Sequence, residues 1–240
     1  MKIAEKLAAK AKDNFEQPGV TIAFLGDSIT QGCFELYRID EERFETVFDK
    51  NSAYHFYLAK ILSVLYPTVP VTMINAGVSG GNAEHGLKRL ERDVLRHRPD
   101  LTVVCFGLND CGHYADGLKT YCDSLEQIFA NLEEAGSEII FMTPNMMATY
   151  VSFRLKDEKF RLIAEKSAER QNEGVLDMYL NEAKKICERR GIKVCDCYEK
   201  WKVLSNNGVD VTELLANQIN HPLREMNWLF AVSLVETMLS

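Results

Sequence analysis

The sequence predicts an α/β fold, a three-layer α/β/α sandwich in which a parallel sheet is covered by helices on both faces. Two observations lead to this prediction. Apolar runs of strand length recur along the chain, and segments with apolar residues at helical spacing lie between them. Such alternation is typical of parallel sheets, because each parallel connection needs a crossover, usually a helix, that packs on one face of the sheet.

Five apolar runs are expected to form the strands: Val20–Leu25, Val69–Asn75, Leu101–Phe106, Glu138–Thr143 and Ile192–Asp196. Three amphipathic stripes between these runs predict helices within residues 54–65, 87–94 and 118–132. The long charged segment Lys156–Arg190 is also expected to be helical, with a break near Gln171–Gly174. A last helix is expected to start at Pro222.

Domain organisation is predicted to be simple. No internal repeat, low-complexity tract or linker interrupts the 240 residues, so one domain is expected over 1–240, with an N-terminal helix in 1–17. Segments 33–50 and 146–160 do not fit the alternation and are interpreted as insertions at the carboxyl edge of the sheet. They either wall a substrate pocket or are ordinary surface insertions.

Composition and charge exclude several classes of protein. Hydrophobic residues make up 46% of the chain and charged residues 26%, which is the balance of a soluble globular protein. The net charge is −7 and no stripe of Lys and Arg occurs, so nucleic acid is not expected as a partner. No apolar run approaches the roughly 18 residues of a membrane span, and Met1–Gln17 lacks a signal-peptide core. A cytoplasmic protein is expected, and the sequence carries no signal for its oligomeric state.

The cysteines are interpreted as reduced, buried thiols. Three of the seven lie inside apolar patterns: Cys105, Cys122 and Cys187. The Cys195–Cys197 pair resembles half of a metal site, but no second pair of suitable ligands completes it. A metal site at these cysteines is therefore not expected.

A serine occupies the most informative position in the chain. The first strand stops at Gly26, and Asp27 and Ser28 then lie on the turn that leaves it. In open α/β sheets the reactive groups gather at the carboxyl ends of the strands. Ser28 is therefore the candidate nucleophile, and it needs a base within hydrogen-bond reach because a serine hydroxyl is a weak nucleophile at neutral pH.

His221 is the candidate base. Pro222 favours the first helical position, so His221 is expected at the N-terminus of the last helix, where the helix dipole helps to keep the imidazole neutral. Three other histidines fall within helical patterns and are interpreted as surface or core residues: His55, His85 and His97. His113, near the end of the third strand, is a reserve candidate.

Acyl transfer also requires hydrogen-bond donors for the developing oxyanion. Gly77 ends the second strand, where a glycine lets the backbone approach a ligand closely and offers its N–H. Asn109 follows the third strand in Gly107–Asp110, and its side-chain amide offers two donors. Each turn alone is ordinary, whereas turns of this kind after three successive strands indicate a site.

These motifs carry a family resemblance. Gly26–Ser28, Gly77, Gly107–Asp110 and His221–Pro222 resemble, in order and rough spacing, the four blocks of the SGNH hydrolases, also called GDSL-type lipases or acylhydrolases. The resemblance runs from about Gly26 to His221, which is most of the chain.

The resemblance implies a fold and a set of roles. The fold would be flavodoxin-like, with five parallel strands in the order 2-1-3-4-5. Ser28 would be the nucleophile and His221 the general base, without metal or cofactor. The N–H groups of Ser28 and Gly77 and the side chain of Asn109 would form the oxyanion hole.

One position departs from the family pattern. The family usually has an acid three residues before the histidine, and this chain has Gln218 there. Four interpretations remain open: the Gln218 carbonyl orients His221, a main-chain carbonyl does so in a Ser–His dyad, or Asp210 or Glu213 folds back to replace the acid. A neutral amide in this role can select the wrong tautomer and greatly reduce the rate.

The predicted function is a serine esterase that forms an acyl-enzyme. No long apolar lid is present to bind a fatty chain, so a small-molecule ester with a short acyl group is favoured, with acetyl on a carbohydrate as the leading example. The alternatives are a lysophospholipase or thioesterase of the same family, which would need an apolar channel, and a non-catalytic carbohydrate-binding module on the same fold. Nucleotide binding is disfavoured, because no Lys-Ser/Thr follows Gly26–Gly32.

Overall fold

The central sheet of the computed structural model, which describes residues 1–240, has five parallel strands in the order β4-β1-β5-β6-β7. Their bounds are Val20–Gly26 for β1, Val71–Gly77 for β4, Leu101–Cys105 for β5, Glu138–Met142 for β6 and Lys193–Cys195 for β7. Counted along the chain, this is the order 2-1-3-4-5, so the predicted fold class is confirmed. The five predicted strands match these positions to within two residues at each end.

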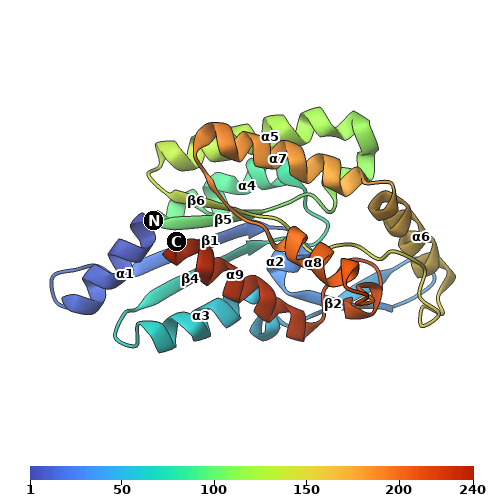
Figure 1. Cartoon of the computed structure of the whole chain (residues 1–240), viewed down its shortest axis with the longest axis horizontal. Coiled ribbons are helices and arrows are strands. Elements are labelled where there is room, and N and C mark those ends of the chain that lie inside the picture. Colours follow the sequence, from blue (N-terminus) through green and yellow to red (C-terminus); the bar gives the residue numbers. More distant parts are fainter.

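Helices cover both faces of the sheet (Figure 1). The helices are α1 (Lys2–Lys12), α2 (Ser28–Gln31), α3 (Tyr54–Leu65), α4 (Ala83–Asp93), α5 (Tyr114–Glu134), α6 (Glu158–Asn172), α7 (Val175–Arg190), α8 (Cys197–Asn206) and α9 (Asn227–Leu239). One face carries α1, α3 and α9, and the opposite face carries α4, α5 and α7. None of these helices is both long and apolar enough to cross a membrane.

The core explains why the strands are almost continuously apolar. A parallel strand with helices on both faces has no solvent side, so its residues are buried whichever way they point. In β5 every residue is buried, and in β1 all but Thr21 are. The main hydrophobic cluster contains 52 buried residues. Register then aligns the strand ends, since Gly26 lies opposite Gly77 on one side and Cys105 on the other.

The helix boundaries confirm one prediction and correct another. The charged segment breaks between α6 and α7 at Gly174, which has a left-handed φ of 73°. The last helix, α9, begins at Asn227, so the predicted start at Pro222 was wrong. Pro222 instead forms an isolated β-bridge with Leu215, and a short 3-10 turn, Arg224–Met226, precedes the helix.

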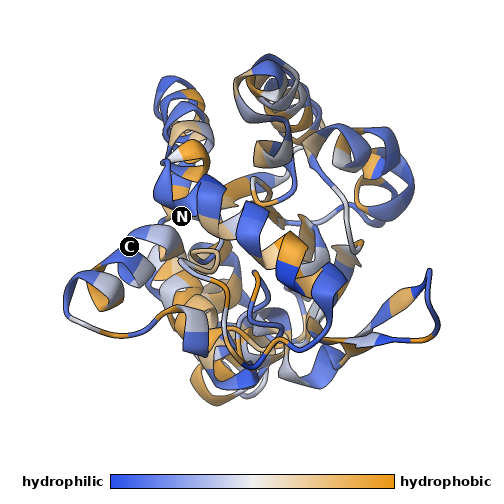
Figure 2. Ribbon diagram, turned by 90° about the vertical axis from the view of Figure 1, so that its right-hand side faces the viewer, coloured by the Kyte–Doolittle hydropathy of each residue, from blue (hydrophilic) through white to orange (hydrophobic).

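The two segments interpreted as insertions both reach the carboxyl edge of the sheet. The first forms an antiparallel hairpin of β2 (Cys33–Arg38) and β3 (Phe44–Phe48), which projects from the body of the protein (Figure 2). The second packs on the loop that carries His221, where the N–H of Ala148 donates to the carbonyl of Ile219 at 2.8 Å. Both segments therefore contact the region in which the candidate residues lie.

Candidate active site

Ser28 is held by the tight turn between β1 and α2. The carboxylate of Asp27 caps α2 by accepting the N–H of Ile29 at 2.9 Å, which is the usual role of Asp at this position. Ser28 is the first residue of the helix, so its own N–H has no partner inside the helix. Gly26 is required just before the turn, because a Cβ there would lie 2.1 Å from the hydroxyl of Thr30.

Ser28 and His221 meet although 193 residues separate them in the chain. The hydroxyl oxygen of Ser28 lies 3.0 Å from Nε2 of His221, and Nδ1 of the same ring lies 2.8 Å from the main-chain carbonyl of Phe34. A carbonyl oxygen can only accept a hydrogen bond, so Nδ1 carries the ring proton and donates a hydrogen bond to the carbonyl of Phe34. Nε2 is then the unprotonated nitrogen, which can accept the proton of the serine hydroxyl.

The backbone around His221 is organised by two asparagines that the sequence analysis did not single out. The side-chain oxygen of Asn217 accepts the N–H groups of Ile219, Asn220 and His221 at 2.9–3.0 Å. The amide of Asn145 donates to the carbonyl of Asn220 at 2.8 Å. The tendency of Asn to bond backbone groups a few residues ahead was the available signal for Asn217, whereas Asn145 is remote in sequence and gave none.

None of the three side chains considered as replacements for the missing acid is hydrogen-bonded to the imidazole of His221. Gln218 has a left-handed φ of 57°, and its amide donates to the carbonyl of Leu215 at 2.8 Å. Asp210 accepts the hydroxyl of Tyr150 at 2.7 Å, and Glu213 pairs with an arginine at 2.9 Å. Of the four interpretations, the geometry matches the main-chain carbonyl.

Burial determines the protonation state of His221. Its side chain is 5% exposed, and desolvation lowers its pKa from the ordinary 6.5 to about 4, although the carbonyl of Phe34 and the charge of Glu35 oppose this shift. The expectation that the dipole of the last helix acts on His221 was wrong, because α9 begins six residues after His221. The imidazole is therefore neutral at pH 7, as a general base must be.

This pKa leads to a prediction for the pH dependence of ester hydrolysis. Because the base works only when unprotonated, kcat/KM is expected to stay on its plateau as the pH falls below 6.5 and to decline with an apparent pKa of about 4. The measurement is a pH profile of kcat/KM with a neutral ester. An acidic limb centred near 6.5 that persists when Asp27 is replaced by asparagine would contradict the buried, neutral state of His221.

A control separates His221 from a neighbouring carboxyl group. Burial raises the pKa of Asp27 to about 7, so this group also titrates near the site. The Asp27→Asn variant keeps an oxygen that can cap α2 and removes the titration. The limb near pH 4 is expected to persist in this variant, whereas a limb near pH 7 that disappears in it would be assigned to Asp27.

Asn109 and Gly77, the two expected oxyanion donors, differ in the structure. The amide of Asn109 donates to the carbonyl of Gly81 at 2.8 Å, and an amide has a second N–H to offer. The N–H of Gly77 donates to the side-chain oxygen of Asn75 at 2.9 Å. Successive N–H groups of a strand point to opposite sides, and that of Val78 bonds Gly26 of β1, so that of Gly77 points away from β1.

Gly77 has a structural reason to be glycine. A Cβ at this position would lie 2.2 Å from the backbone nitrogen of Gln31, so the close packing of β4 against α2 excludes any side chain. The expected role of Gly77 as an oxyanion donor does not fit this geometry, because its N–H is engaged and directed outwards.

Gly80 offers an unengaged N–H that the sequence analysis did not consider. The N–H of Gly81 bonds the carbonyl of Val78 at 3.0 Å, which closes a turn with Gly80 at a left-handed φ of 72°. The hydrogen bond from Asn109 to Gly81 holds this turn against the end of β5. The N–H of Gly80 has no hydrogen-bond partner within the protein. A glycine in a turn just after a strand was the available signal.

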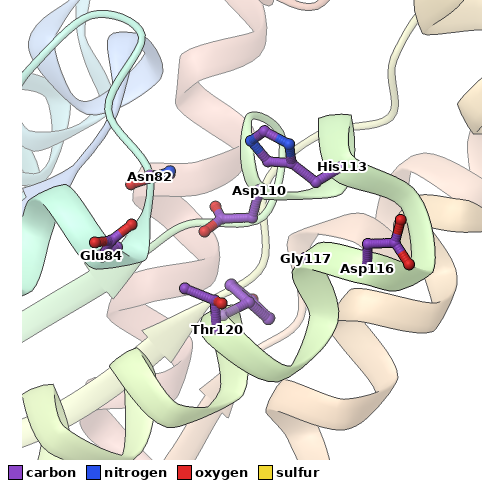
Figure 3. A pocket seen from close by; sticks show the side chains of 8 residues that line it. Asn82, Glu84, Asp110, His113, Asp116, Gly117 and Thr120 are labelled. Atoms are coloured by element: carbon purple, nitrogen blue, oxygen red, sulfur yellow. The ribbon is translucent and has the colours of Figure 1, made fainter.

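His113, the reserve candidate base, lies elsewhere. It lines a cleft of about 270 Å³ between the start of α4 and α5, together with Asp116 (Figure 3). Asp110 also lines this cleft, where its carboxylate accepts the N–H groups of Ala83 and Gly107 at 2.9 Å and so ties α4 to the end of β5. The hydrogen bond to Ser28 is made by His221.

The fold and the site together define a class of protein. It is an α/β/α sandwich with a serine on the turn after its first strand and a histidine, from a loop before its last helix, bonded to that serine. The sequence model of the GDSL-like Lipase/Acylhydrolase family matches residues 24–229. The chain belongs to this family.

Two curated relatives with similar sequences are esterases. The chain is 27% identical over 135 residues to an acetylxylan esterase from Geobacillus stearothermophilus, which covers 52% of this chain and 60% of the relative. It is 27% identical over 110 residues to an arylesterase from Vibrio mimicus, covering 46% of this chain and 54% of the relative. The matched segments thus span less than two thirds of either relative's own length.

Solved structures resemble the chain over most of its length. The acetylxylan esterase Axe2 from Geobacillus stearothermophilus aligns with a TM-score of 0.67 at 22% identity, covering 92% of this chain and 94% of that one. A lipase/acylhydrolase from Enterococcus faecalis aligns with a TM-score of 0.65 at 22% identity, covering 90% and 94%. At this level of identity the likeness establishes the shared fold.

Proposed function

We propose that this protein is a serine esterase that transfers an acyl group from an ester to Ser28 and then to water. The observation that carries the proposal is the hydrogen-bonded series from Ser28 through His221 to the carbonyl of Phe34. This series provides a nucleophile, a neutral base and a group that orients the base, which are the three parts that nucleophilic acyl transfer requires.

The reaction follows from the positions of these groups. Ser28 Oγ attacks the ester carbonyl carbon as its proton moves to Nε2 of His221, and a tetrahedral oxyanion forms. The bond to the alcohol oxygen then breaks, and the imidazolium returns the proton to the departing alcohol. Water attacks the acyl-enzyme by the same route, which releases the acid and restores Ser28.

The oxyanion is stabilised by donors at the ends of three strands. We assign these to the N–H of Ser28 after β1, the N–H of Gly80 after β4 and the second N–H of the Asn109 amide after β5. The support for Gly80 over Gly77 is that its N–H is unengaged and that Asn109 anchors its turn. These donors are already positioned before the substrate binds, so little reorganisation opposes the reaction.

Asn109→Ala is expected to lower kcat by roughly 10²–10³-fold, the usual cost of losing one oxyanion donor. The measurement is steady-state kinetics with p-nitrophenyl acetate. Asn131→Ala, an exposed asparagine on α5, is the matched control and is expected to retain wild-type kcat. Equal kcat values for the two variants would show that Asn109 is not an oxyanion donor.

The substrate is assigned to short acyl esters, with acetyl groups on a carbohydrate as the leading candidate. Ser28 and His221 are only 3% and 5% exposed, and the sequence has no long apolar lid that would bind a fatty chain. Similar proteins include an acetylxylan esterase and a two-domain esterase active on acetylated mannans. The ring of Phe48, at the base of the hairpin, is exposed and lines a cleft with Gln31 and Gly77, and an aromatic face of this kind suits contact with a sugar ring.

The deciding experiment compares hydrolysis of p-nitrophenyl acetate, butyrate and octanoate with release of acetate from acetylated xylo-oligosaccharides. The proposal expects the highest kcat/KM among the nitrophenyl esters for acetate, together with release of acetate from the oligosaccharide. A maximum at octanoate would indicate a lysophospholipase or thioesterase. No turnover and no labelling of Ser28 by a fluorophosphonate would indicate a binding module.

A further inference from the structure

Arg224 occupies an unusual position three residues after His221. Its guanidinium lies 4.3 Å from the centre of the Phe34 ring, and it donates to both carboxylate oxygens of Glu35, at 2.5 and 2.9 Å. It also donates to Asp49 at 3.2 Å. The side chain of Arg224 therefore contacts both Phe34, whose carbonyl accepts the hydrogen bond from the imidazole, and its neighbour Glu35.

These contacts join three segments that are far apart in sequence. Phe34 and Glu35 belong to β2, Asp49 follows β3, and Arg224 lies in the short turn beyond the histidine loop. The N–H of Asp49 donates to the carbonyl of Gly32 at 2.8 Å, which ties the cluster to the end of α2, the helix that begins with Ser28. The cluster thus connects the strand that orients His221 with the elements that hold both members of the Ser–His pair.

We propose that Arg224 is a positioning residue, which clamps β2 so that the carbonyl of Phe34 serves the histidine in place of the missing acid. This inference rests on the proposed esterase function. A carbonyl acceptor belongs to the backbone and has no side-chain torsions of its own, so its position depends on the strand that carries it. The strand β2 lies in a projecting hairpin outside the central sheet, and the forked contact to Arg224 restrains it there.

The chemistry of the clamp requires arginine. Its planar guanidinium stacks on an aromatic face and offers two parallel donors to one carboxylate, whereas the ammonium of lysine does neither. The cluster also contains two carboxylates and one cation, so it leaves a net negative charge near the imidazolium that forms during the reaction. In this way Glu35, held by Arg224, supplies part of the negative charge that an acid at position 218 would provide, although Glu35 does not bond the imidazole itself.

The test compares Arg224→Met with Arg190→Met. Arg190 is a matched control, because it also pairs with two carboxylates, those of Glu126 and Glu133, and its side chain is 24% exposed against 30% for Arg224. Arg224→Met is expected to lower kcat on the order of 10²-fold with KM changed far less, since a small misplacement of a reacting group has this cost. Arg224→Lys is expected to recover little of the loss. Arg190→Met is expected to retain wild-type kcat.

A second readout does not depend on turnover. A buried imidazole N–H bonded to a carbonyl is expected to give a downfield proton NMR signal, assigned by its absence in a His221 variant. Arg224→Met should shift or broaden this signal and Arg190→Met should not. If Arg224→Met fails to fold, Glu35→Gln, which breaks one arm of the fork, is subjected to the same two measurements and is expected to show a smaller loss of kcat.

The outcomes separate the two proposals. Wild-type kcat and an unchanged signal in Arg224→Met or, where that variant is unfolded, in Glu35→Gln, would overturn the positioning role while leaving the esterase function intact. A wild-type protein without esterase activity would overturn the proposed function, and the NMR signal would still decide whether Arg224 holds Phe34 against His221.

Discussion

Replacing Ser28 by alanine is expected to reduce the kcat of ester hydrolysis on the order of 10⁶-fold, by analogy with serine proteases. No other hydroxyl is bonded to the imidazole of His221, whose two ring nitrogens bond Ser28 and the carbonyl of Phe34. Without the hydroxyl no acyl-enzyme can form, and only direct attack by water remains. The residual rate would still exceed that in water, because the oxyanion donors are intact.

The measurement is turnover of p-nitrophenyl acetate together with mass spectrometry of the protein after exposure to a fluorophosphonate. The wild type should gain one adduct on Ser28, and the variant should gain none. Thr30, a buried hydroxyl two residues away that bonds Tyr54 at 2.8 Å, serves as a control for reagent specificity and should stay unlabelled. Turnover that survives in Ser28→Ala would assign the activity to another residue.

His221→Ala is expected to cause a loss similar to that of Ser28→Ala, again about 10⁶-fold in kcat by analogy with serine proteases. The reason is that the serine hydroxyl ionises only when Nε2 accepts its proton, and no second base lies within hydrogen-bond reach of Ser28. The acidic limb expected near pH 4 should also vanish, since the group that titrates is gone. The remaining rate should rise with pH as hydroxide replaces the base.

Two controls sharpen this result. The double variant Ser28→Ala/His221→Ala is expected to be no slower than either single variant, because the two residues act as one unit. His113→Ala should retain wild-type kcat, since this exposed histidine lines a cleft elsewhere. Additive losses in the double variant would show that Ser28 and His221 act independently, and a large loss in His113→Ala would restore that residue as a candidate base.

The sheet was predictable because its signals are local. Strands buried on both faces must be apolar throughout, so Leu101–Cys105 and Val20–Gly26 stand out in the sequence. Helix α8 and the hairpin of β2 and β3 were missed, since their sequences mix aromatic and charged residues without a clear period. The start of the last helix was wrong because proline also fits a turn, and Pro222 pairs with Leu215 there.

The candidate site was predictable to different degrees. Ser28 and Asn109 follow strands at motif positions, and the structure places them at the carboxyl edge of the sheet. The sequence analysis named Gly77 and did not consider Gly80, because a sequence does not show which N–H near the end of a strand is already engaged. Only the three-dimensional structure of the turn shows that the N–H of Gly77 bonds Asn75 and that the N–H of Gly80 is free.

By itself, the sequence determined the fold class, the family and the candidate nucleophile and base, because apolar periodicity and short motifs are properties of neighbouring residues. Only the tertiary structure decided what holds the imidazole. The acceptor is the main-chain carbonyl of Phe34, 187 residues away from His221, and every residue has such a carbonyl. A backbone acceptor has no side-chain signature, so its partner is defined by how distant segments pack, here by the fold that brings β2, Arg224 and the histidine loop together.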